Sequence, residues 1–143
     1  MKQLHDVFVY GTLMSGFGNN SIISHTEPEI DCSIGPIKAT TEDDFVLTAY
    51  THSFPAMYRF VGADAAPVHG EIWSVHPMTL ERMDTLEGHP HWYKREKIWV
   101  KAENGVRVQV MTYIMQGRLR GQQIPNHDWK KFKENPINRL TYR

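Results

Sequence analysis

Short apolar segments separated by glycine- and proline-containing turns recur along the chain. Residues 7–10 form a continuous apolar run that ends at Gly11, which is typical of a strand buried on both faces. Residues 57–61 and 93–101 alternate instead, as strands with one solvated face do. The other predicted strands are residues 45–50, 68–75 and 106–115, and residues 30–41 are expected to form one strand or two. We expect six or seven of these segments to form strands.

One segment has the pattern of a helix. Pro77 is well placed in a first helical turn, and Leu80, Met83 and Leu86 follow at a spacing that brings them to one face. Gly88 is typical of the left-handed residue that ends a helix. We therefore expect the main helix to run from Pro77 to the residue before Gly88.

Shorter elements are predicted from local signals. Asp128 is a suitable N-cap for a short helix over residues 128–132. Residues 21–25 fit either a short helix or a strand. The pair Asn104 and Gly105 favours a type I′ hairpin turn, in which both residues take positive φ angles. Residues 117–127 are expected to be a loop, and the C-terminal tail is polar.

These elements predict an α+β fold with a mixed, largely antiparallel sheet curled into a barrel, one main helix and one or two short helices. A length of 143 residues is typical of one domain, expected to span residues 1–143 with a core at about residues 6–130. No repeat or low-complexity linker divides the sequence.

Composition narrows the class of protein. Lys plus Arg and Asp plus Glu both number 16, so the balanced charge gives no basic footprint for nucleic acid or an anionic membrane. No stretch approaches the about 20 apolar residues of a membrane span. The single cysteine, Cys32, excludes an internal disulfide and argues against a cysteine-based zinc site. A reducing, cytoplasmic location is expected, and the oligomeric state stays open.

Two segments far apart in the sequence carry the candidate chemistry. Residues 10–13 follow the first strand with a glycine turn, whose consecutive N–H groups can form a nest for a carboxylate or oxyanion. Residues 84–88 end the main helix and carry a carboxylate, Glu87, on its last turn. Together they would supply free N–H groups and a proton-shuttling acid. Taken singly, each has a plain structural alternative: a strand-to-loop turn, and a solvated helix end.

Six motifs follow one another along the chain: residues 10–13 (Tyr-Gly-Thr-Leu), 16–19 (Gly-Phe-Gly-Asn), 54–57 (Phe-Pro-Ala-Met), 68–73 (Val-His-Gly-Glu-Ile-Trp), 84–88 (Asp-Thr-Leu-Glu-Gly) with 93–95 (Tyr-Lys-Arg), and 125–129 (Pro-Asn-His-Asp-Trp). In this order, they resemble the motifs of the gamma-glutamylcyclotransferase-like, or AIG2-like, superfamily over about residues 6–130. Asn20 departs from the family pattern, in which a histidine is common. His127 stands where glycine is common. Both departures are expected to bear on what fits the pocket.

The resemblance implies an intramolecular aminolysis of a small γ-glutamyl substrate, which gives 5-oxoproline and a free amine with no metal or cofactor. It implies that Glu87 is the catalytic proton shuttle, and a helix C-terminus should raise the pKa of such a carboxyl. The residues expected to bind substrate are Tyr10, Gly11, Thr12, Leu13, Asn19 and Tyr93. The alternative is a non-catalytic module that binds a small metabolite in the same pocket.

Several of these residues keep a second interpretation. Tyr10 either lines the pocket or fills the core, and Asn19 either contacts substrate or holds its own loop by local hydrogen bonds. Tyr93 is a pocket wall or a half-buried strand residue. Arg95 either pairs with a substrate carboxylate or lies on a solvated face. The pair His89 and His91 shows no third ligand in the sequence, which argues against a metal site.

Overall fold

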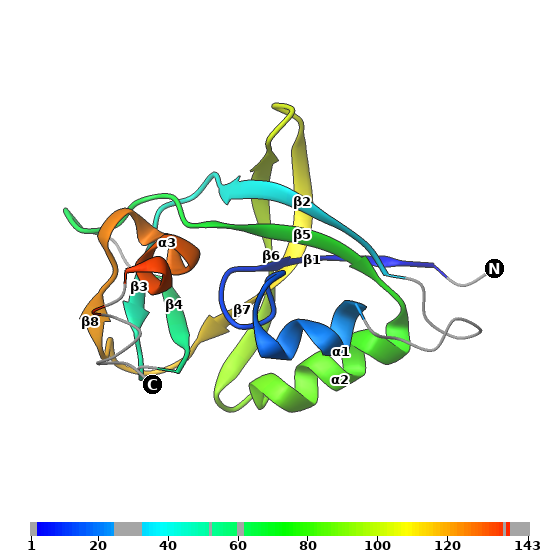
Figure 1. Ribbon diagram of the computed structural model, residues 1–143, viewed down its shortest axis with the longest axis horizontal. Coiled ribbons are helices and arrows are strands. Elements are labelled where there is room, and N and C mark those ends of the chain that lie inside the picture. Colours follow the sequence, from blue (N-terminus) through cyan, green and yellow to red (C-terminus); the bar gives the residue numbers. More distant parts are fainter. Residues whose placement is uncertain (1–2, 25–32, 52, 60–61, 136, 138–143) are drawn as a thin grey trace.

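The computed structural model describes residues 3–24, 33–51, 53–59, 62–135 and 137 (Figure 1). The strands are β1 (His5–Val9), β2 (Ile34–Thr41), β3 (Phe45–Ala49), β4 (Pro55–Arg59), β5 (His69–Val75), β6 (Tyr93–Ala102), β7 (Arg107–Met115) and β8 (Gln122–Gln123). The α-helices are α1 (Ser21–Ser24), α2 (Pro77–Glu87) and α3 (Trp129–Glu134), with 3-10 turns η1 (Gly18–Asn20) and η2 (Pro125–His127). Within these residues, no helix is long and apolar enough to cross a membrane.

Five strands close into a barrel in the order β1-β5-β2-β6-β7, and β4-β3-β8 form a second sheet. β1 pairs antiparallel with β5 and parallel with β7, and Val7 stands opposite Trp73 on one side and Met111 on the other. The predicted α+β fold with a mixed barrel is confirmed. The strand count exceeds the prediction because the two-residue β8, which pairs with β3, is too short to leave a pattern in the sequence.

The continuous apolar run in β1 is buried as predicted, with Val7 and Phe8 fully inaccessible at the centre of the barrel wall. Trp73 and Trp129 are also buried. From the sequence, Trp73, Trp99 and Trp129 are expected to pack the barrel or cover its ends, and Trp99 does not pack inside it. Its side chain is 40% exposed on β6, where the Arg107 guanidinium lies 4.5 Å from the centre of its ring.

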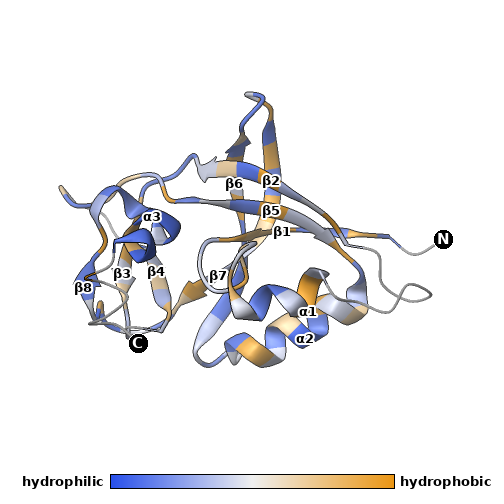
Figure 2. Ribbon diagram, viewed as in Figure 1, coloured by the Kyte–Doolittle hydropathy of each residue, from blue (hydrophilic) through white to orange (hydrophobic). Residues whose placement is uncertain are grey.

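Helix α2 begins and ends where the sequence predicts. The His76 side chain accepts a hydrogen bond from the Met78 N–H at the N-terminus, and Gly88 closes the other end with φ 66°. Its apolar face is shorter than expected, since Leu86 is 42% exposed. α1 and α2 lie side by side at one end of the barrel (Figure 1), and Figure 2 shows hydrophobic and hydrophilic bands along α2. The C-terminal end of α2 lies beside the turn that follows β1.

For the shorter elements, predictions from local sequence signals were confirmed at α3 and wrong at the hairpin turn between β6 and β7. Residues 21–24 form a helix rather than a strand, and Asp128 caps α3 by accepting from the Lys131 N–H. The predicted type I′ turn is wrong. Among the described non-glycine residues only Asn126 and His127 have positive φ, so Asn104 does not. Instead the hairpin has a three-residue loop with Gly105 in the left-handed region, and the N–H of Gly105 donates to the Ala102 carbonyl (2.8 Å).

Candidate active site

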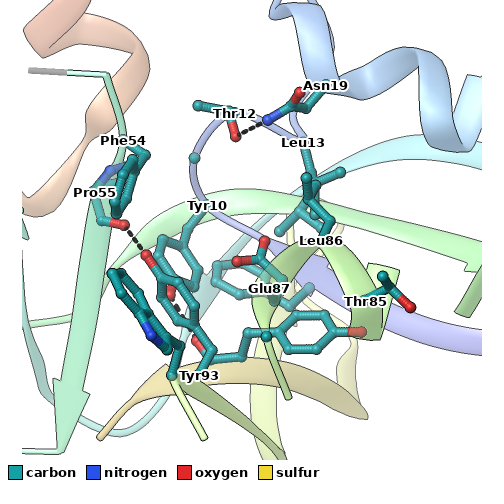
Figure 3. Close-up of a pocket in the computed structure, with 16 residues that line it drawn as sticks. Tyr10, Thr12, Leu13, Asn19, Phe54, Pro55, Thr85, Leu86, Glu87 and Tyr93 are labelled. Atoms are coloured by element: carbon teal, nitrogen blue, oxygen red, sulfur yellow. Dashed lines mark hydrogen bonds between the residues drawn. The ribbon is translucent and has the colours of Figure 1, made fainter. Parts of the chain in front are cut away.

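A cavity of about 460 Å³ opens where β1, the following turn, the start of β4, the end of α2 and the start of β6 meet. We call it the Glu87 cavity. All seven residues that the sequence analysis placed in the site line its wall, although they come from distant parts of the chain (Figure 3). They are Tyr10, Gly11, Thr12, Leu13, Asn19, Glu87 and Tyr93.

Glu87 is the last residue of α2, and its carboxylate lies between Tyr10 and Leu86 in Figure 3. Burial raises the pKa of the Glu87 carboxyl from its ordinary 4.5 to about 7, because an apolar surrounding penalises the charged form. The direction agrees with the sequence prediction, but the cause is desolvation rather than the helix dipole. A carboxyl with this pKa can accept and return a proton near neutral pH.

The turn after β1 lines the cavity and contains backbone donors that the described part of the chain does not use. The Met14 N–H closes it by donating to the Gly11 carbonyl (3.0 Å). Within the described part of the chain, the N–H groups of Thr12 and Leu13 have no backbone or side-chain acceptor. Two adjacent free N–H groups form the kind of nest that binds a carboxylate or a developing oxyanion.

Gly11 is required in this turn for space, not for an unusual backbone angle. A Cβ atom at this position would lie 2.7 Å from Cγ of Pro55. The φ angle of Gly11 lies outside the left-handed region, whereas Gly16 in the same loop has φ 91°. The close approach of Gly11 to Pro55 joins the turn to the start of β4 and sets the width of the cavity at this side.

Tyr10 and Tyr93 contribute their rings to the wall, while their hydroxyls bond to the backbone. The Tyr10 hydroxyl donates to the Tyr113 carbonyl (2.6 Å), and the Tyr93 hydroxyl donates to the Pro55 carbonyl (2.7 Å). Burial is the largest cause of the raised pKa of both phenols. Both therefore stay protonated at neutral pH, and their hydroxyls tie the end of β1 to β7 and β6 to β4 beside the cavity.

Two asparagines hold the loop that follows β1. Asn19 Nδ2 donates to Thr12 Oγ1 (2.9 Å), so Asn19 both lines the cavity and fixes its own loop. The buried Asn20 donates from Nδ2 to the Leu13 carbonyl (2.8 Å). Asn20 and His127 were expected to alter what fits the pocket, yet neither side chain belongs to the cavity wall. Asn20 acts on the turn from behind.

Arg95 lies outside the cavity wall and pairs with an acid of its own protein. Its Nη1 atom contacts Asp84 Oδ2 at 2.5 Å, and the Tyr113 hydroxyl donates to the other Asp84 oxygen (2.6 Å). His89 Nδ1 in turn accepts from the Arg95 N–H (2.9 Å). Asp84 is thus a structural helix residue that ties α2 to β6 and β7.

One buried acid was given no role from the sequence: Glu71 on β5, which is 4% exposed. Its carboxylate accepts from the N–H of Ser15 (2.8 Å), from the Ser15 hydroxyl (2.6 Å) and from Trp73 Nε1 (3.2 Å), and it pairs with Lys130 at 3.4 Å. The sequence feature that could have identified Glu71 is an acidic residue in the middle of an apolar strand. Glu71 anchors the far end of the loop whose near end carries the free N–H groups.

Metal ligands do not assemble in this part of the molecule. Over the described ranges, no three His, Cys, Asp or Glu side chains cluster in a way that could hold a metal ion. Cys32 lies outside the described residues. The Glu87 cavity itself offers a carboxyl group, backbone N–H groups and aromatic walls.

The comparisons with known proteins agree on one family. The family model described as gamma-glutamyl cyclotransferase, AIG2-like, matches residues 7–131. A Methanocaldococcus jannaschii protein provisionally named a gamma-glutamylcyclotransferase is 29% identical over 127 residues, 89% of this chain and 97% of the relative. A Danio rerio protein named gamma-glutamylaminecyclotransferase C is 32% identical over 71% of this chain and 65% of its own length. The crystal structure of an AIG2-like protein from Mus musculus has a TM-score of 0.69 at 25% identity, covering 82% and 80%.

Proposed function

The chain belongs to the gamma-glutamyl cyclotransferase, AIG2-like family, and we propose that it is an enzyme that converts a γ-glutamyl amide into 5-oxoproline and a free amine. One observation carries the proposal. Glu87, a half-buried carboxyl group whose pKa is raised to about 7, lines the same cavity as Thr12 and Leu13, whose N–H groups have no acceptor in the described part of the chain. The reaction needs one proton carrier and a set of fixed donors, and these residues match that need.

In the proposed reaction, the substrate's α-ammonium gives a proton to the Glu87 carboxylate. The resulting amine attacks its own γ-carbonyl carbon, and the new C–N bond closes the five-membered ring. As the bond to the departing nitrogen breaks, Glu87 returns its proton to that nitrogen. The ring nitrogen gives its second proton to water, and the released amine takes one proton from water to become an ammonium ion. No redox change or co-reactant is needed.

The turn supports the charge that develops in this step. When the amine attacks, the carbonyl oxygen becomes an oxyanion, and fixed N–H donors stabilise it in a site with little water. The Thr12 and Leu13 N–H groups serve either this oxygen or the substrate's α-carboxylate. Holding the substrate bent brings its amine to its carbonyl, and such positioning lowers a large share of the barrier.

The experiment is to incubate the protein with γ-glutamyl amino acids, γ-glutamyl-ε-lysine, γ-glutamyl ethylamide and glutathione, and to measure 5-oxoproline. Glu87→Gln keeps the shape of the side chain and removes the proton carrier, so kcat should fall by about 10²- to 10⁴-fold. Glu81→Gln is the matched control, because Glu81 is an exposed acid on the same helix. Tight binding of these compounds without turnover would instead support the non-catalytic binding module.

Location remains a prediction. The single cysteine favours a reducing compartment, and we propose that the reaction takes place in the cytoplasm.

A further inference from the structure

We propose that the Glu87 cavity selects substrates whose departing amine carries an uncharged aromatic or apolar substituent. This inference rests on the proposed function and concerns the part of the substrate that is released. It follows from the charges on the cavity wall and from an apolar rim formed by Phe54, Leu86 and Trp92.

The cavity wall offers no cation to a second carboxylate. Among the described residues that line it, Glu87 is the only one with a formal charge. The two free N–H groups of Thr12 and Leu13 are taken up by the glutamyl part of the substrate. A carboxylate on the departing amine would therefore lie near an acidic group without a partner, and burying an unpaired charge is costly. An uncharged substituent avoids this cost.

The rim is apolar and partly open to solvent. Trp92 is 54% exposed and Leu86 is 42% exposed, although both are large apolar side chains beside a cavity. Figure 3 shows Phe54 and Leu86 on either side of the Glu87 carboxylate. Exposed apolar groups gathered at one opening are typical of a binding surface. A ring or alkyl chain lying there would remove them from water.

The aromatic part of the rim is a built feature of the fold. The Tyr50 ring stacks on Phe54 with 5.5 Å between ring centres, and it meets Trp92 edge to face at 6.0 Å. The backbone of Trp92 is fixed at both sides, because its N–H donates to the Gly88 carbonyl and its carbonyl accepts from the Gln116 N–H, each at 3.0 Å. The same glycine that ends α2 behind Glu87 thus places Trp92 at the opening.

Polarity decides which end of the substrate meets the rim. The glutamyl group carries the ammonium that must reach Glu87 and the oxygens that need the Thr12 and Leu13 donors. Only the substituent on the departing nitrogen is left to extend past Glu87. We place this substituent at the rim because Leu86 and Trp92 are the exposed large apolar side chains among the described residues that line the cavity.

Three substrates differ by one group at a time and test this assignment. γ-Glutamyl ethylamide and γ-glutamyl phenethylamide differ by a phenyl ring, and γ-glutamylphenylalanine adds one carboxylate to the phenethylamide. We expect kcat/KM for 5-oxoproline release to be about tenfold higher for the phenethylamide than for the ethylamide, the low end for a hydrophobic pocket. We expect the added carboxylate to reverse that gain. Equal values for the three compounds would overturn the inference.

Variants locate the effect. Trp92→Ala should remove most of the advantage of the phenyl ring, measured as the ratio of kcat/KM for the phenethylamide to kcat/KM for the ethylamide, and Trp92→Phe should restore part of this ratio. Trp99→Ala is the matched control, because Trp99 is an exposed tryptophan on β6 that lines no part of the cavity. A full phenyl advantage in Trp92→Ala would contradict the role of the rim.

The same experiment separates this inference from the proposed function. Product from the ethylamide without a preference for the ring would refute the rim alone. No product from any of the three compounds would refute the proposed function. In that case calorimetric Kd values decide the rim, and tighter binding of the phenethylamide than of the other two would support it, whereas equal or weaker binding would overturn it.

Discussion

Replacing Glu87 by glutamine should change how the stability of the protein depends on pH. Burial raises the pKa of this carboxyl from 4.5 to about 7 in the folded protein, so the folded state holds a proton that the unfolded chain releases. The contribution of the protonated carboxyl to stability is fully present below pH 4.5. It is lost progressively as the pH rises through about 7, because the folded protein must then bury a charge. Glutamine stays neutral throughout.

The size of the effect follows from the shift. One unit of pKa difference corresponds to about 1.4 kcal/mol, so the rise from 4.5 to about 7 is worth about 3 kcal/mol between low and high pH. Relative to wild type, Glu87→Gln should therefore gain about 3 kcal/mol of unfolding free energy between pH 4 and pH 8. The two proteins differ only at residue 87, so the contributions of all other groups cancel in the difference.

The assay is urea unfolding of wild type and Glu87→Gln at pH values from 4 to 8, with Glu81→Gln as an exposed control on the same helix. The linear dependence on urea gives the free energy at each pH. The Glu81→Gln difference should be flat. If the Glu87→Gln difference is equally flat, the carboxyl titrates as it does in water, and the claim that it is buried in the cavity is wrong.

Three further substitutions test other parts of the account. Gly11→Ala should lower the unfolding free energy by about 1–3 kcal/mol and abolish turnover, because the added methyl would lie 2.7 Å from Pro55 Cγ. An active and stable variant would refute the close approach of Gly11 to Pro55. Glu71→Gln should cost about 1–3 kcal/mol and raise KM, since an amide cannot accept from both groups of Ser15; unchanged KM would show that the loop needs no anchor. Gly105→Ala should cost about 1–2 kcal/mol at φ 88° without affecting activity, and a stable variant in urea unfolding would contradict the hairpin geometry.

Local signals made much of the fold predictable. The start and end of α2 were set by Pro77 and Gly88, and the buried run at residues 7–9 was evident from its composition. The type I′ turn failed because a two-residue and a three-residue hairpin loop share the sequence Asn-Gly, and the register of β6 against β7 decides between them. β8 could not be found because its two residues are defined only by pairing with β3.

The sequence predicted which residues line the cavity, but not the contacts that bring them together. Glu87 and the turn after β1 were brought together as expected, on the strength of ordered motifs. The cause of the raised pKa of Glu87 depends on which distant side chains exclude water from it, and the need for Gly11 depends on Pro55, which is far away in the sequence. Glu71 was overlooked because its partner Ser15 lies in another element.

The most direct test of the central claim is the pH dependence of kcat/KM for 5-oxoproline formation from γ-glutamyl ethylamide. With Glu87 as the proton acceptor, kcat/KM of the wild-type protein should rise as the pH passes through about 7 and then level off, and Glu87→Gln should lose both the activity and this inflection. An equal rate in Glu87→Gln, or the same inflection in both proteins, would contradict the assignment of the proton shuttle to this carboxyl.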